Sequence, residues 1–131
     1  MTWIIAYIAA ALVFGILDAI WLGWAGNNFY RPNIGEIMAD SFRAVPAIIF
    51  YVFYVAGMVY FAIRPGLANG LGTAALNGAL LGALCYGTWG LTNQATLKVW
   101  PSHLTVTDIA WGAFATGMAA LAATWITGRL T

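Results

Sequence analysis

The chain has 131 residues, of which 63% are hydrophobic and only 7% are charged, whereas a soluble domain carries about 25% charged residues. Its length leaves room for one domain, and its net charge of +1 provides no clustered basic surface of the kind that nucleic acids require. The composition therefore indicates an integral membrane protein and excludes a nucleic-acid-binding protein.

Four segments are long and apolar enough to cross a bilayer, for which a helix needs about 20 mostly apolar residues. They are Trp3–Trp24, Val45–Ile63, Leu71–Thr92 and Leu104–Ile126. The first segment lacks the basic start and the small-residue cleavage site of a signal peptide, so we expect it to be retained. The pattern predicts an all-α bundle of four transmembrane helices in a single domain, residues 1–131. Both termini then lie on one side of the membrane, side A, and the first and third loops lie on side B.

The first loop, Ala25–Ala44, is the longest, and its apolar residues recur at helical spacing. Asn33 followed three residues later by Glu36 is typical of a helix N-cap with its reciprocal acid. We therefore expect a short interfacial helix lying on the membrane surface, with a structured connecting loop as the alternative. Pro65 and Gly66 are expected to end the second span.

Two of the four acidic residues, Asp18 and Asp108, lie inside predicted spans, and each is followed three residues later by a tryptophan, Trp21 or Trp111. Ionisable side chains within spans are energetically costly and mark functional sites by default. Both aspartates lie on faces rich in small residues, along which membrane helices approach one another closely. We expect both carboxylates to point into the bundle, in one polar layer near side B.

Further polar residues are expected around that layer. The predicted ligand or proton site is a polar basin open to side B, formed by Asp18, Trp21, Asp108, Trp111, Asn93 and Tyr86. Arg31 and Lys98 are expected either to supply a counter-charge or to bind a lipid headgroup. The alternative for the aspartates is structural, because a carboxylate that accepts hydrogen bonds fixes how helices pack. The alternative for the two basic residues is that they extend to the headgroups.

Gly78 and Gly82 form a GxxxG pair in the third span, which predicts a helix–helix contact within the bundle or between two protomers. The histidine, the cysteine and the acidic residues do not have the spacing of metal ligands. No nucleophile with a partner base can be named either. We therefore assign no metal, no cofactor and no catalytic residue, and we do not expect an enzyme.

Several motifs spread over the whole chain resemble a known family. They are Leu17-Asp18-Ala19-Ile20-Trp21-Leu22, Asn28-Phe29-Tyr30-Arg31, Leu91-Thr92-Asn93-Gln94-Ala95-Thr96-Leu97-Lys98 and Asp108-Ile109-Ala110-Trp111-Gly112. The set is similar to the small predicted bacterial membrane proteins called domain of unknown function 2177. The resemblance implies a four-span protein of the bacterial inner membrane and brings no activity with it.

Three classes of function remain. We expect first a protein that binds an amphipathic small molecule or a membrane lipid, with its polar head in the basin and its apolar tail between helices. The first alternative is a homodimeric transporter or channel coupled to protons or cations, although its acidic sites would lie near one face rather than at the midplane. The second alternative is an accessory or assembly subunit of a larger membrane complex.

Overall fold

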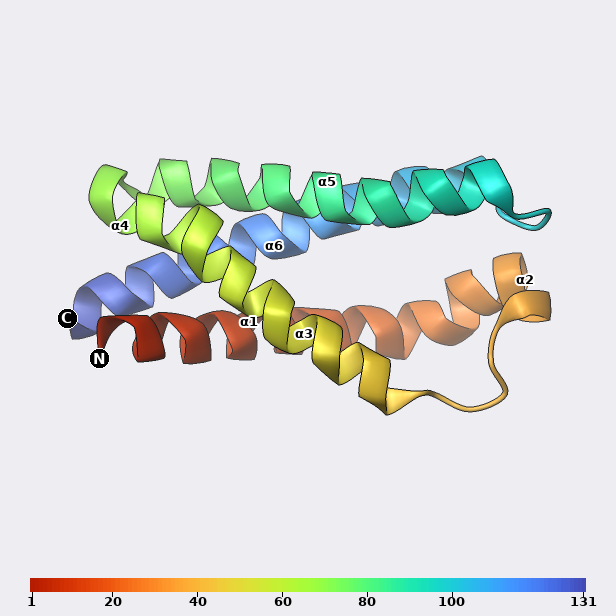
Figure 1. Ribbon diagram of the computed structural model, residues 1–131, viewed down its shortest axis with the longest axis horizontal. Coiled ribbons are helices and arrows are strands. Elements are labelled where there is room, and N and C mark those ends of the chain that lie inside the picture. The colour runs from red at the N-terminus through yellow and green to blue at the C-terminus, as the bar shows by residue number, and fades with distance from the viewer.

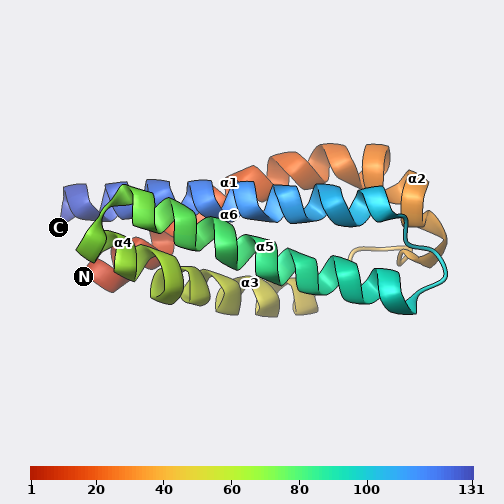
Figure 2. The same cartoon turned by 90° about the horizontal axis from the view of Figure 1, so that it is seen from above.

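The computed structural model describes all 131 residues, and nearly all of them are helical (Figure 1). Four long helical passes run back and forth along the molecule, over Thr2–Ile37, Ala44–Asn69, Leu71–Thr96 and Ser102–Leu130. Both termini lie at the same end of the bundle in both views (Figures 1 and 2). The all-helical architecture of four passes is therefore confirmed, and we refer to the end with the termini as the side-A end.

Three of the four passes are long and apolar enough to cross a membrane by length and composition, and α5 (Leu71–Thr96) is not among them. α5 has no charged residue, but glycine, alanine, threonine and amide side chains make it less apolar than the others. It lies along α6 (Ser102–Leu130) in both views (Figures 1 and 2). The small residues of α5 face α6. The hydropathy of α5 is therefore lower because the side of the helix that packs against protein has few large apolar side chains.

The first pass is longer than the sequence predicted. α1 (Thr2–Ala25) continues through a π-helical turn, Gly26–Tyr30, into α2 (Arg31–Ile34). A final 3₁₀ turn ends at Ile37. The expected separate surface helix is therefore wrong, because the helix does not end where the loop was predicted to begin. The Asn33 side chain does not cap a helix; it donates a hydrogen bond to the Phe29 carbonyl, at 2.7 Å.

In each of the first two passes, a π-helical turn lies just before a proline, and the helix continues beyond that proline. Pro32 follows the π-helical turn Gly26–Tyr30, and Pro65 follows a second π-helical turn, Val59–Ile63. A proline has no N–H, and its ring clashes with the carbonyl four residues earlier in an α-helix. The wider π turn removes that conflict, so the helix continues. Pro65 therefore does not end the second pass as we predicted, and α4 (Arg64–Asn69) continues it up to Gly70, whose φ is +115°.

α3 (Ala44–Met58) crosses the bundle obliquely and does not reach the side-B end (Figure 1). Two tyrosine hydroxyls fasten it to α1 by donating to backbone carbonyls. Tyr7 donates to Val52 at 3.0 Å, and Tyr51 donates to Ala11 at 3.1 Å. Because α3 begins short of that end, the space between α1 and α5 lacks a fourth helix near side B.

Small residues allow α5 and α6 to approach closely. A Cβ atom added at Gly78 would lie 2.8 Å from the Ala120 Cβ, and one added at Gly82 would lie 2.9 Å from the Thr116 hydroxyl. Both distances are too short for real side chains. The predicted contact of the GxxxG pair is therefore confirmed, and it lies within the bundle rather than between protomers.

The outer surface of the bundle is apolar in the manner of a lipid-facing protein. Along α1, large aliphatic side chains at four-residue spacing are exposed, namely Ile4, Ile8, Leu12, Ile16 and Ile20. Such continuous apolar patches are too large for the surface of a soluble monomer. This stripe and the small-residue faces lie on opposite sides of their helices, as expected where packing excludes lipid.

The even number of passes gives a testable topology. In a Cys85→Ala background, we expect cysteines at Thr2 and Thr131 to react with an impermeant maleimide from one face of sealed vesicles. Cysteines at Asp40 and Ser102, which are exposed at the other end of the bundle, should react only from the opposite face. Labelling of positions 2 and 131 from opposite faces would contradict the four-pass topology.

Candidate functional site

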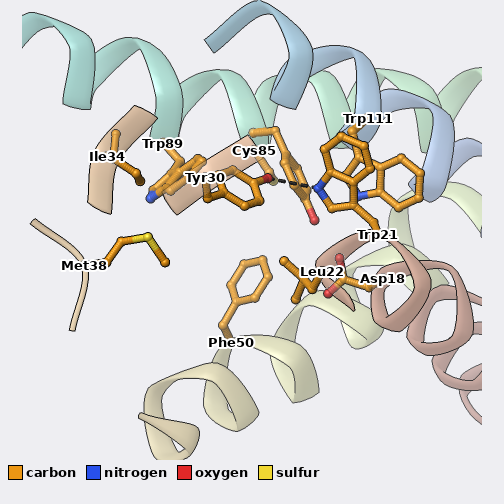
Figure 3. Close-up of a pocket in the computed structure, with 11 residues that line it drawn as sticks. Asp18, Trp21, Leu22, Tyr30, Ile34, Met38, Phe50, Cys85, Trp89 and Trp111 are labelled. Atoms are coloured by element: carbon orange, nitrogen blue, oxygen red, sulfur yellow. Dashed lines mark hydrogen bonds between the residues drawn. The ribbon is translucent and has the colours of Figure 1, made fainter. Parts of the chain in front are cut away.

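A cavity of ≈ 490 Å³ lies at the side-B end, where α3 leaves the bundle open. Ten of its eleven lining residues are hydrophobic. Small-molecule sites measure about 300–1,000 Å³ and combine mostly apolar walls with a few polar groups. The lining residues come from all parts of the chain and are Asp18, Trp21, Leu22, Tyr30, Ile34, Met38, Phe50, Cys85, Tyr86, Trp89 and Trp111 (Figure 3).

The walls of the cavity are largely aromatic. Cys85, Tyr86 and Trp89 project from one face of α5, since residues three and four apart in a helix share a face. Phe50 comes from α3, and its ring stacks on that of Tyr54, with centroids 5.0 Å apart. Aromatic rings therefore border the cavity on the sides of both α3 and α5.

The two Asp-x-x-Trp motifs meet through their tryptophans. The Trp21 and Trp111 rings stack with centroids 4.8 Å apart and an interplanar angle of 13°. α1 and α6 run in opposite directions, and three residues of helix rise by about 4.5 Å. The two aspartates therefore lie on opposite sides of the stacked indoles along the bundle axis. The expected single carboxylate layer is replaced by an arrangement in which Asp18 and Asp108 flank the indole pair.

Two hydrogen bonds in series connect Trp21 of the first Asp-x-x-Trp motif to Asp108 of the second. The Trp21 indole N–H donates to the Tyr30 hydroxyl at 3.0 Å (Figure 3), and that hydroxyl donates to Oδ1 of Asp108. Asp108 has no exposed surface, and its Oδ2 atom has no hydrogen-bond partner. Asp108 thus lies behind the cavity wall and contacts the cavity through Tyr30.

Tyr30 owes its position to the π-helical turn. It is the last residue of Gly26–Tyr30. A π turn contains one more residue than an α turn, which rotates the following side chains by about 100° around the helix axis. Ile34 of α2 also packs with Trp100, which lies just before α6, and with Leu104 of α6, and this contact holds the segment over the bundle. Single π turns of this kind are frequent at functional sites.

Asp18 is half-buried in the cavity wall and has no hydrogen-bond donor or basic partner. The buried indole N–H of Trp111 has no hydrogen-bond acceptor. Arg31 is exposed and donates to Asn27 at 3.4 Å, and Lys98 is exposed. Neither basic side chain lines the cavity, so the structure does not bring the expected counter-charges to the aspartates.

The predicted site residues are mostly brought together. Four of them line the cavity, namely Asp18, Trp21, Tyr86 and Trp111. Asp108 lies one hydrogen bond away, behind Tyr30, and Asn93 is half-buried outside the lining. Sequence reasoning did not place Phe50, Cys85 or Trp89 in the site. Trp89 and Cys85 share a helix face with Tyr86, which is a usable signal, whereas nothing local identifies Phe50.

The sequence matches a protein family described as Predicted membrane protein (DUF2177) over residues 3–125. No curated protein and no solved structure matches the chain. The matched region includes every residue that lines the cavity.

Proposed function

We propose that this chain, which belongs to the DUF2177 family of predicted membrane proteins and is a polytopic integral membrane protein, binds an amphipathic small molecule or lipid. The observation that carries this proposal is the cavity at the side-B end, with ten hydrophobic lining residues and a single carboxylate, that of Asp18. We place the protein in a bacterial inner membrane. The apolar walls would hold the hydrophobic part of the molecule, and Asp18 would orient its polar end.

The rim of the cavity suits a ligand that arrives through the membrane. Leu22, Phe50 and Trp89 line the cavity and yet are 46%, 50% and 43% exposed, so the cavity is open at these residues. The residues at this opening are apolar. An amphiphile dissolved in the bilayer can enter there without passing through water.

The transporter or channel that the sequence also allowed receives less support. Below the cavity, towards side A, Phe14, Tyr54 and Met58 are buried in a core packed with alanines. The Tyr54 hydroxyl is hydrogen-bonded to the Thr116 hydroxyl at 2.7 Å within that core. A route across the membrane would have to cross these packed side chains. The GxxxG pair is also occupied by α6, so a transporting homodimer would need another interface.

An accessory or assembly role is compatible with the fold but does not explain why the protein has a cavity. The two readings predict different behaviour of Cys85, which is the only cysteine and lines the cavity. A ligand in the cavity would shield this thiol, whereas a purely structural subunit would leave it equally reactive with and without lipid extraction.

The test uses this native thiol as a reporter. We expect N-ethylmaleimide to alkylate Cys85 several-fold faster in protein stripped of lipid than in native membranes. We further expect native mass spectrometry to detect a bound small molecule or lipid that is lost after alkylation with a bulky maleimide. Cysteine at Ala68, exposed at the side-A end, in a Cys85→Ala background is the matched control and should react at similar rates in both preparations. Equal rates at Cys85, with no bound mass lost on alkylation, would contradict ligand binding.

A further inference from the structure

We propose that the polar end of the bound molecule is a cation, so that the ligand is an amphiphile bearing a protonated amine or a quaternary ammonium group. This inference rests on the proposed function and specifies its ligand class. It is carried by two features of the cavity, namely uncompensated negative charge and aromatic walls.

The negative charge in and behind the cavity has no counter-charge. Asp18 is the only charged side chain among the eleven lining residues. Asp108, behind Tyr30, has one carboxylate oxygen without any partner. All basic side chains of the chain are exposed and outside the lining, namely Arg31, Arg43, Arg64, Lys98 and Arg129. A buried carboxylate without a partner is costly, and a cationic ligand would compensate it.

The aromatic lining is suited to the same kind of group. Three of the eleven lining residues are tryptophans, and three more are tyrosine or phenylalanine. The six aromatic residues are Trp21, Tyr30, Phe50, Tyr86, Trp89 and Trp111. The face of an aromatic ring attracts a cation within about 6 Å of its centroid, and tryptophan does so best. Aromatic faces arranged around one carboxylate are a setting in which quaternary ammonium groups are recognised.

Other head groups fit this chemistry less well. A phosphate or carboxylate head would be repelled by Asp18 and would find no arginine, lysine or histidine in the lining. A neutral carbonyl or hydroxyl head would leave the charge of Asp18 uncompensated. The predicted order of affinity is therefore cation, then neutral head, then anion.

Three compounds with the same tail separate these cases: brominated decyltrimethylammonium, decanol and decyl phosphate. Bromine quenches tryptophan fluorescence on contact, and three of the seven tryptophans line the cavity. With the wild-type protein in micelles of dodecyl maltoside, whose head group is uncharged and carries no ammonium, we measure the quenching that an excess of the unbrominated compound reverses. We expect the ammonium compound to half-saturate at a concentration about tenfold below that of decanol, a factor that corresponds to about 1.4 kcal/mol. Decyl phosphate should be the weakest of the three.

Asp18→Asn keeps the size of the side chain and removes its charge, so it should bring the ammonium and alcohol compounds to similar affinities. Glu36→Gln is the matched control, because Glu36 is an exposed acid of the same helical pass outside the cavity lining. It should retain the preference for the cation. A preference that survives Asp18→Asn would overturn the role given to Asp18.

The wild-type comparison decides the sign of the preference even if the Asn variant does not fold. Equal affinities, or stronger binding of the alcohol or the phosphate, would overturn the cationic ligand while leaving amphiphile binding intact. No reversible quenching by any of the three compounds would instead count against the proposed function itself.

Discussion

Replacing Gly82 with leucine is expected to prevent accumulation of folded protein. A Cβ at this position would lie 2.6 Å from the carbonyl carbon of Gly112 and 2.9 Å from the Thr116 hydroxyl. Backbone atoms of α6 cannot rotate away as a flexible side chain can. Overpacking a well-filled core costs about 1–3 kcal/mol when side chains can adjust. Here the two helices must separate along their whole contact, so the loss should exceed that range.

Gly72→Leu is the matched control, because Gly72 lies in the same helix and nothing would contact a Cβ added there. The measurement is the yield of monodisperse protein in mild detergent and the temperature at which half of it is lost. We expect Gly72→Leu to match the wild type and Gly82→Leu to give little or no monodisperse protein. Similar melting of both variants would mean that this face of α5 faces lipid rather than α6.

Tyr30→Phe is expected to have the second largest effect on stability. The phenol of Tyr30 accepts from the Trp21 indole and donates to Asp108, so its loss leaves both groups without that partner. Each buried polar group left unsatisfied costs about 1–3 kcal/mol, and charged groups cost more. Asp108 has no exposed surface and would keep no hydrogen-bond donor to either carboxylate oxygen. We therefore expect a clear shift of unfolding to lower SDS fraction in mixed micelles.

Tyr60→Phe is the control, since Tyr60 is 55% exposed and its ring contacts Arg64 through its face rather than through its hydroxyl. Its unfolding should be indistinguishable from that of the wild type. In an Asp108→Asn background, Tyr30→Phe should cost less, because no buried charge is then left unpaired, and this non-additivity measures the coupling. Equal losses for Tyr30→Phe and Tyr60→Phe would show that the hydrogen-bond chain contributes nothing.

Both experiments concern the fold and leave the identity of the ligand to the cavity experiments. The glycine substitution tests whether α5 and α6 form the compact half of the bundle. The tyrosine substitution tests whether the π-helical turn delivers a side chain on which the buried acid depends.

The sequence by itself determined the class of protein, the number of passes and the residues on packed faces. Long apolar segments can be recognised locally because a bilayer core of fixed thickness requires about 20 apolar residues. The GxxxG pair at Gly78 and Gly82 was likewise readable, since only small residues allow backbones to approach closely. The unusual placement of Asp18 and Asp108 in apolar segments also pointed to the part of the bundle in which the cavity lies.

Helix ends at prolines were harder to predict. Pro32 and Pro65 are strong local signals for a break, yet both helices pass through them. A π turn can absorb the proline only when the widened helix still packs well, and that depends on distant contacts such as those of Ile34 with Trp100 and Leu104. Local sequence does not contain these contacts.

Only the tertiary structure decided how the site is assembled. The antiparallel course of α1 and α6 stacks Trp21 on Trp111 and places the two acids on either side. The rotation at the π turn brings Tyr30 to Asp108, and the oblique course of α3 leaves the cavity open beside Phe50. Sequence spacing fixes which residues share a face of one helix, but it does not fix the rotation, depth and crossing angle of one helix against another. Those quantities are set by the packing of the whole bundle.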